Sequence, residues 1–181
     1  DSVKLAYVYA SNDYELAALL EGVQEELPDV PLIGNTSFSG VITPEGYIHG
    51  EEGFVGVMAV SDPDMEVGVA AVEKGGCPVE AGEKAAKLAM EKAGKTEAPD
   101  YYYMTAPPGL EEFYVKGITK VIGRVPFYGG SAADNTLEGK WKCYTDQGVL
   151  NDGVAVAFFY TDKKMTNKFI GAYRETKDAG I

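Results

Sequence analysis

Two segments of this chain are followed, about 100 residues later, by segments that resemble them. Residues 30–37 (VPLIGNTS) match residues 125–132 (VPFYGGSA), and residues 53–62 (GFVGVMAVSD) match residues 153–162 (GVAVAFFYTD). This spacing is far longer than the roughly 20–50 residues of solenoid repeats. The repeat predicts two half-domains of similar structure that pack on each other and leave a cleft between two matching polar segments.

The hydrophobic pattern predicts an α/β (α+β) fold. Residues 3–10 are expected to form a buried strand and residues 30–33 a second strand. Between them, residues 14–27 carry apolar residues at the spacing of an amphipathic helix. A strand, helix and strand with short connections predict a parallel pair with a right-handed crossover. We expect a single domain over residues 1–181 with two duplicated β-α-β-β-β-β halves, at about 3–75 and 100–175, forming mixed sheets flanked by helices and joined by a helix at 78–94.

Turn signals predict two hairpins. One joins residues 47–49 to 54–60, and the other joins residues 142–150 to 153–160 around Asn151-Asp152-Gly153. A final strand is expected at residues 169–173.

The charge balance limits the classes of partner. The chain has 16 Lys and Arg against 28 Asp and Glu, for a net charge of −12. Nucleic acids and anionic membranes attract basic surfaces, so neither is expected as a partner. No apolar run reaches the roughly 18–20 residues of a membrane-spanning helix. We expect Cys77 and Cys143 to be free thiols in a reducing compartment, and therefore a cytoplasmic location.

Each polar segment directly follows a predicted strand. Ligands bind beyond the carboxyl ends of strands in open α/β sheets, and glycine permits close approach of the backbone. Hydroxyl, amide and carboxylate groups in both segments can recognise a small polar ligand, although such segments also occur as plain turns. Trp141 could stack on the ligand or pack in the core. The expected ligand-binding residues are Gly34, Asn35, Thr36, Ser37, Gly129, Gly130, Ser131, Asp134, Asn135 and Trp141.

Other functions remain open at the level of sequence. A hydrolase could use Ser131 or Cys143 as nucleophile, with His49, the only histidine, as base. A haem needs a single axial ligand, which His49 or Cys77 could supply. An interaction module could use the aromatic run at residues 101–103. No metal site is expected, because zinc takes three or four ligands and the candidates are scattered.

The motif PFYGGSAAD at residues 126–134, followed by NDGVAVA at residues 151–157, resembles the FIST N-terminal domain. Residues 30–37 and 53–57 also match, and the resemblance covers about residues 3–161. It implies a non-enzymatic intracellular sensory domain for signal transduction that binds a small ligand, with amino acids favoured. It also implies a FIST C-terminal domain or a signalling output domain as partner. Some relatives are reported as haem-dependent nitric oxide sensors, which makes haem the alternative cofactor.

An amino acid would then bind between the two halves. We expect its amine to meet Asp134 and its carboxylate to meet the backbone amides of Gly34, Gly129 and Gly130.

Overall fold

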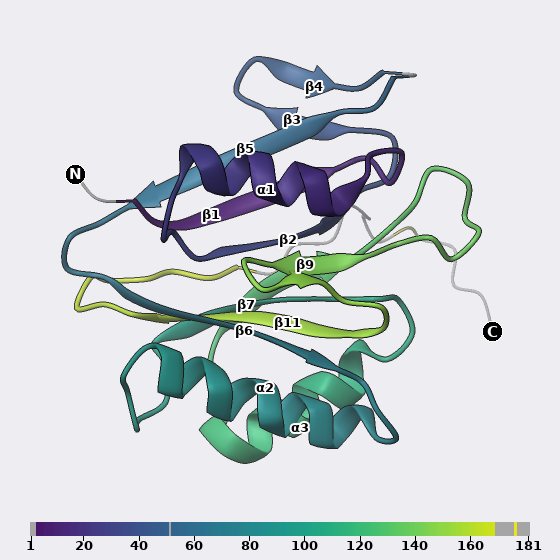
Figure 1. Cartoon of the computed structure of the whole chain (residues 1–181). Helices are drawn as coiled ribbons and strands as arrows, with labels where there is room; N and C mark the ends of the chain where they lie inside the picture. The colour runs from purple at the N-terminus through teal and green to yellow at the C-terminus, as the bar shows by residue number, and fades with distance from the viewer. Residues whose placement is uncertain (1–2, 51, 169–175, 177–181) are drawn as a thin grey trace.

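Two large β-sheets, a separate two-stranded sheet and three helices form the described part of the computed structural model, which comprises residues 3–50, 52–168 and 176 (Figure 1). Helix α1 packs on the first sheet, and α2 and α3 pack on the second. A third apolar cluster joins the two sheets. This is the mixed α/β fold that the sequence predicts, while the duplication of its halves stays a prediction.

The first sheet has the strand order β10-β9-β2-β1-β5. β1 pairs in parallel with β2, with α1 as the crossover, and antiparallel with β5. The elements are β1 (Val3–Ala10), α1 (Leu16–Glu26), β2 (Leu32–Thr36), β5 (Val55–Ser61), β9 (Cys143–Thr145) and β10 (Gly148–Val149).

The second sheet has the order β6-β11-β7-β8, again with one parallel pair, β7 and β8, joined through a helix. A separate two-stranded sheet holds β3 and β4. The elements are β3 (Val41–Thr43), β4 (Gly46–Ile48), β6 (Glu66–Glu73), α2 (Pro78–Lys92), β7 (Tyr101–Ala106), α3 (Glu111–Ile122), β8 (Phe127–Ser131) and β11 (Gly153–Tyr160).

The two halves of the chain exchange strands. β6 belongs to the N-terminal half but pairs with β11 in the second sheet, and β9 belongs to the C-terminal half but pairs with β2 in the first. Each sheet is therefore completed by the other half of the chain.

Alternation along the central strands sends side chains to two different cores. On β7, Tyr102 and Met104 face the helices, whereas Tyr101 and Tyr103 face the other sheet. A run of residues buried on both faces explains why these strands are almost uniformly apolar in sequence.

Several expected boundaries and pairings are wrong. The first helix begins at Leu16 and not at residue 14, because the carboxylate of Glu15 caps it by accepting the N–H groups of Ala17 and Ala18. The segments 34–36 and 129–131, expected as loops, are the last residues of β2 and β8.

Both expected hairpins are also wrong. β4 turns back onto β3 and not onto β5, and β10 turns back onto β9 and not onto β11. At the expected second turn, the N–H groups of Asn151 and Asp152 instead donate to the Glu73 carboxylate, where the chain crosses from one sheet to the other. The strand expected at residues 169–173 lies outside the described residues.

Glycine permits α2 and α3 to cross closely. A Cβ added to Gly117 would lie 2.0 Å from the carbonyl oxygen of Val79, and one added to Gly82 would lie 2.4 Å from that of Tyr114. Backbone therefore meets backbone at this crossing, and no side chain can move aside to make room.

Gly117→Ala is expected to destabilise the fold by about 1–3 kcal/mol, the usual cost of overpacking a tight core. Gly22, on exposed α1, is the matched control because an added Cβ there meets nothing within 4 Å. Gly22→Ala is expected to stabilise by up to about 1 kcal/mol through helix propensity. Urea denaturation of both variants measures the difference, and equal effects would contradict the close crossing.

Candidate functional site

A pocket of about 390 Å³ lies between the two sheets at the carboxyl ends of their parallel strands. Both halves of the chain contribute to it. Four of its lining residues are tyrosines: Tyr7, Tyr9, Tyr103 and Tyr128. The other lining residues are Asn35, Ser37, Met58, Gly129, Gly130 and Ser131.

Strand periodicity places the tyrosines there. Tyr7 and Tyr9 are two residues apart on β1, so both side chains point towards the second sheet, and Tyr103 on β7 points back at them. The Tyr7 and Tyr103 rings meet edge to face with centroids 5.1 Å apart, and Tyr128 packs on Tyr103 at 5.3 Å. The pocket therefore has a rigid aromatic wall.

A chain of hydrogen bonds holds the polar ends of these rings. The Tyr9 hydroxyl donates to that of Tyr103 at 3.1 Å, and the Tyr103 hydroxyl donates to Asn35 Oδ1 at 3.3 Å. Thr105 Oγ1 donates to the same Asn35 oxygen at 3.1 Å. The Asn35 side chain is buried and its Nδ2 donates to the Thr36 carbonyl, which fixes the orientation of the amide. The hydroxyls of Tyr7 and Tyr128 bond to each other.

The described residues that line the pocket are uncharged at neutral pH. Burial raises the pKa of Tyr7 and Tyr103 far above the usual value, and it also raises the pKa of Tyr9 and Tyr128. Among the described residues that line the pocket, none is an acid or a basic side chain. Its phenols are therefore protonated at neutral pH and act as hydrogen-bonding groups.

A sequence model of the FIST N domain family matches residues 4–181, which is essentially the whole chain. The chain belongs to the FIST N domain family. Domains of this family are sensory domains of signal transduction. A search of curated proteins found no match.

Five of the ten expected site residues of this FIST N domain line the pocket: Asn35, Ser37, Gly129, Gly130 and Ser131. Gly34 and Thr36 lie inside the first sheet. A Cβ on Gly34 would be 1.8 Å from the Val8 carbonyl oxygen, and Thr36 Oγ1 accepts the Lys142 N–H at 2.8 Å. Gly34 therefore allows β2 to approach β1 closely, and Thr36 bonds β2 to the segment that precedes β9.

Asp134 lies outside the lining of this pocket, and its expected contact with a ligand amine stays a prediction. Its carboxylate oxygens accept backbone N–H groups of Thr136 and Glu138 at 3.0 and 3.2 Å and that of Lys140 at 2.7 Å. Burial raises the pKa of Asp134, but these bonds outweigh it and lower the pKa overall. The carboxylate thus organises its own loop.

Asn135 and Trp141 also lie outside the pocket lining. Asn135 ties three loops together, since its Nδ2 donates to Asp13 at 2.8 Å and to Ser11 at 3.1 Å, and its Oδ1 accepts the Ser39 N–H at 3.0 Å. Ser11 and Asp13 therefore anchor the loop that precedes α1 to the loop that follows β8. Trp141 packs against the core between the sheets.

The sequence interpretation missed the tyrosines as site residues. The signal was available, because β1 carries tyrosines at positions 7 and 9 and β7 carries them at positions 101 and 103, two residues apart in each strand. Hydroxyls at that spacing on a buried strand face the same side and need partners there.

Of the residues proposed for other chemistries, Ser131 lines the tyrosine-lined pocket, whereas His49, Cys77 and Cys143 do not. Ser131 Oγ donates to a carboxylate oxygen of Glu111 and not to His49, the base expected from the sequence. Burial raises the pKa of the Cys143 thiol to about 12, which keeps it protonated and unreactive. His49 is exposed and stacks on Tyr47 at 5.0 Å, and Cys77 precedes α2, so neither lines the pocket. Both cysteines are free thiols, as expected.

Within the described ranges, no three or more His, Cys, Asp or Glu side chains gather where a metal ion could bind. Over the same residues, no helix combines the length and the apolar character needed to cross a membrane.

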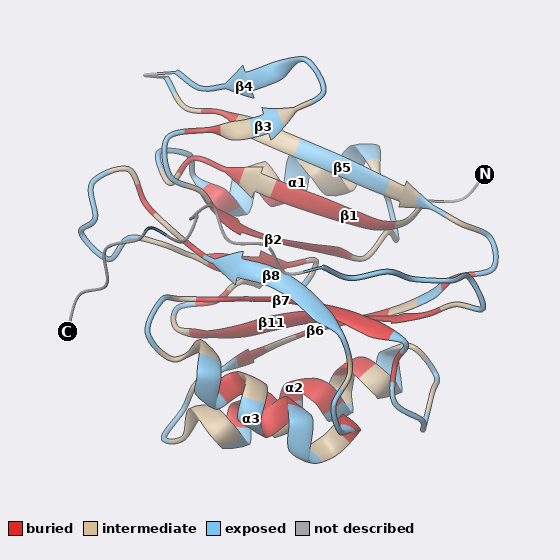
Figure 2. Cartoon of the chain, turned by 180° about the vertical axis from the view of Figure 1, so that it is seen from behind, coloured by how far each residue is buried: buried red, intermediate tan, exposed pale blue. Residues whose placement is uncertain are grey.

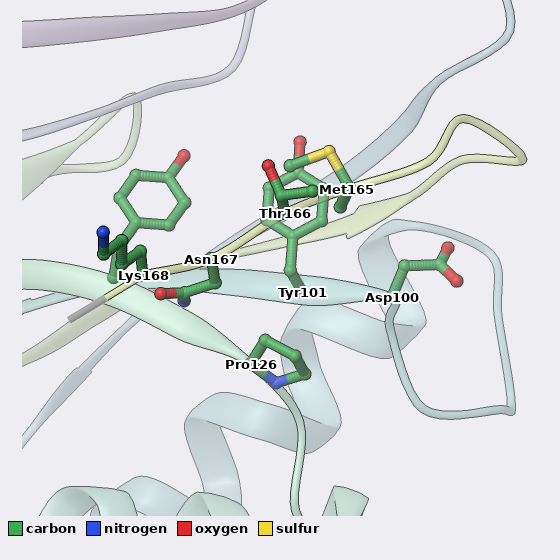
Figure 3. A pocket seen from close by; sticks show the side chains of 8 residues that line it. Asp100, Tyr101, Pro126, Met165, Thr166, Asn167 and Lys168 are labelled. Atoms are coloured by element: carbon green, nitrogen blue, oxygen red, sulfur yellow. The ribbon is translucent and has the colours of Figure 1, made fainter.

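A second pocket, of about 350 Å³, lies at the opposite ends of β7 and β8 (Figure 3). Asp100, Tyr101 and Pro126 line it together with residues 165–168, and Asn167 Nδ2 donates to the Phe127 carbonyl at 3.0 Å. It lies at the amino ends of the strands, and we therefore take the tyrosine-lined pocket as the candidate site.

The buried phenols predict a loss of stability in alkali. Burial raises the pKa of Tyr102 to about 12 and those of Tyr7 and Tyr103 further, against about 10 in the unfolded chain. The folded state binds these protons more tightly, so its stabilisation is complete below about pH 10 and is lost as pH rises towards 12 and beyond. Urea denaturation at increasing pH is expected to show this fall, with a smaller fall in Tyr103→Phe. A free energy of unfolding that stays constant to pH 12 would contradict it.

Proposed function

We propose that this FIST N domain is a non-enzymatic sensory module that binds a small zwitterionic ligand, with amino acids as the first class to test, in the tyrosine-lined pocket. The observation that carries the proposal is the convergence of neutral hydrogen-bonding groups from both halves on one cavity. The volume of about 390 Å³ suits a small molecule, for which sites of roughly 300–1,000 Å³ are usual.

The ligand's ammonium group is expected to meet hydroxyl oxygens. Ser37 Oγ donates to the Gly40 carbonyl, Ser131 Oγ donates to Glu111, and the Tyr9 hydroxyl donates to Tyr103. Each of these oxygens has used its own hydrogen and still offers lone pairs as acceptors. The pocket is therefore rich in acceptors, and this arrangement replaces the expected role of Asp134.

The ligand's carboxylate is expected to meet a phenol. Tyr7 and Tyr128 share one hydrogen bond, so one of the two hydroxyls donates to the other and the second keeps its hydrogen free. That hydrogen is the natural donor for a carboxylate in a pocket with no lysine or arginine among its described lining residues.

Such a ligand would transmit a signal by holding the halves together. It would touch β1 and β2 in the first sheet and β7 and β8 in the second, and it would stabilise the state in which these strands lie as observed. We propose a FIST C-terminal domain or another signalling output domain as the partner that responds. We also propose a cytoplasmic location, which the two free thiols support.

A thermal-shift screen of amino acids tests the proposal. A true ligand at 100 times its dissociation constant is expected to add about 2.7 kcal/mol to stability. Tyr9→Phe, which removes an acceptor in the pocket, is expected to weaken the shift several-fold. Tyr160→Phe is the matched control, because its hydroxyl also donates one bond of 3.1 Å, to the Glu97 carbonyl, but lies outside the pocket lining. No shift with any amino acid at millimolar concentration, or equal loss in both variants, would refute the assignment.

A further inference from the structure

None of the described strands pairs with the outer edge of β8, where Asn167 Nδ2 donates to the Phe127 carbonyl at 3.0 Å. All five residues of β8 are exposed, whereas β7, which pairs with it, and β11, on the other side of β7, are fully buried (Figure 2). A groove of about 1040 Å³ runs along this edge beside α3, and Val115, Thr119, Phe127 and Gly129 are among its lining residues. An exposed strand edge with an apolar groove is a natural site for another strand.

The first sheet shows what covers the corresponding edge of β2. The β9–β10 hairpin pairs there in the register Ile33 opposite Thr145, Gly34 opposite Tyr144 and Asn35 opposite Cys143. The Tyr144 side chain is fully buried in the cluster beneath α1, directly over Gly34. A hairpin thus seals the edge and fills the space between strand and helix.

The β3–β4 hairpin has the same local design as β9–β10. Residues 41–48 (VITPEGYI) match residues 143–150 (CYTDQGVL), with threonine third and glycine sixth in each. Thr43 Oγ1 accepts the Glu45 N–H at 3.2 Å, and Thr145 Oγ1 accepts the Gln147 N–H at 3.2 Å. The glycines that follow, Gly46 and Gly148, have φ of 125° and 116°.

Unlike β9–β10, the β3–β4 hairpin belongs to neither large sheet and leaves Ile42, Tyr47 and Ile48 exposed. Ile42 is 88% exposed and Tyr47 is 54% exposed, whereas Tyr144, which corresponds to Ile42, is fully buried. β3 contacts β5 through Val41, which packs over Gly56.

We propose that the β3–β4 hairpin has a second position on the open edge of β8, paired as β9–β10 pairs with β2. The register places Thr43 opposite Tyr128, Ile42 opposite Gly129 and Val41 opposite Gly130. Ile42 then enters the groove beside α3, while Val41 and Thr43 point to the other face, over the tyrosine-lined pocket. The docked hairpin extends the second sheet and covers one side of the pocket.

The hairpin of the same chain is the occupant because its tether begins beside β8. The Thr36 carbonyl, at the end of β2, accepts the N–H of Ala133, two residues beyond the end of β8, at 2.9 Å. Residues 37–40 join Thr36 to Val41, and a chain of that length spans up to about 17 Å when extended. A hairpin from a second copy lacks this tether and its high local concentration.

A pair of cysteines tests the docked register. Hydrogen bonding of Thr36 to Lys142 makes Asn35 and Cys143 a non-hydrogen-bonded pair, and the equivalent pair on β8 is Gly130 with Val41. Such pairs have Cα atoms about 4.5 Å apart, which is within disulfide range. A Cβ added to Gly130 meets nothing within 4 Å, so Gly130→Cys is tolerated.

The Val41→Cys/Gly130→Cys variant, made with Cys77→Ala, is expected to form an intramolecular disulfide on mild oxidation, identified by peptide mass spectrometry of the monomer. Ile42→Cys/Gly130→Cys is the control, because its side chains would lie on opposite faces, and it is expected to cross-link at least ten times more slowly. Absence of the bond, or equal rates for the two pairs, overturns the proposal. A disulfide-linked dimer overturns the choice of occupant in favour of a second copy.

Hydrogen exchange gives a second test without changing β8. Docking protects amides on the outer edge of β8, so Ile42→Asp, which opposes entry into the groove, is expected to speed exchange within residues 127–131 several-fold. Exchange in β7 serves as the internal reference, and unchanged rates in β8 overturn the proposal. Neither test depends on a ligand, so their outcome is independent of the proposed function.

Discussion

The edge-to-face contact of Tyr7 and Tyr103 joins the two sheets, and the rest of the architecture is arranged around it. Tyr7 lies on β1, which pairs in parallel with β2, and Tyr103 lies on β7, which pairs in parallel with β8. The ring centroids are 5.1 Å apart, which leaves no space for water between the rings. Aromatic pairs of this geometry add about 0.5–1.5 kcal/mol beyond their buried area. The exchange of β6 and of β9–β10 between the sheets reinforces this contact on either side.

A tyrosine core carries a chemical consequence that a phenylalanine core would not. Each buried phenol needs a hydrogen-bond partner, because an unsatisfied polar group costs about 1–3 kcal/mol. Tyr9, Tyr103 and Asn35 satisfy one another in series, and Tyr7 satisfies Tyr128. The same contacts that hold the sheets together thus create a line of oriented hydroxyls at the surface. Structural stability and the candidate site have one origin in this molecule.

Sequence reasoning succeeded where local patterns determine the structure. Apolar runs and helical spacing predicted the central strands and helices, and the matched motifs predicted that Asn35 and Ser131 would share a pocket. It failed where partners lie far apart in the chain. The pairing of β9 with β2 joins residues more than 100 positions apart, and no local signal distinguishes it from the expected hairpin with β11. The sequence also contained no sign of the backbone N–H groups that the Asp134 carboxylate accepts, because these bonds depend on the shape of the loop.

In the proposed function, the ligands that fit the pocket depend on which hydroxyl hydrogens are already donated to other groups of the protein. Ser37, Ser131 and Tyr9 donate to the protein and present lone pairs, while the Tyr7 and Tyr128 pair presents a single free hydrogen. A phosphate or dicarboxylate needs many donors and would instead face oxygens on a chain of net charge −12. A ligand with an ammonium group and one carboxylate matches both the excess of acceptors and the single donor. The ligand selectivity that we propose for this site therefore follows from the direction of the hydrogen bonds, without any charged side chain among its described lining residues.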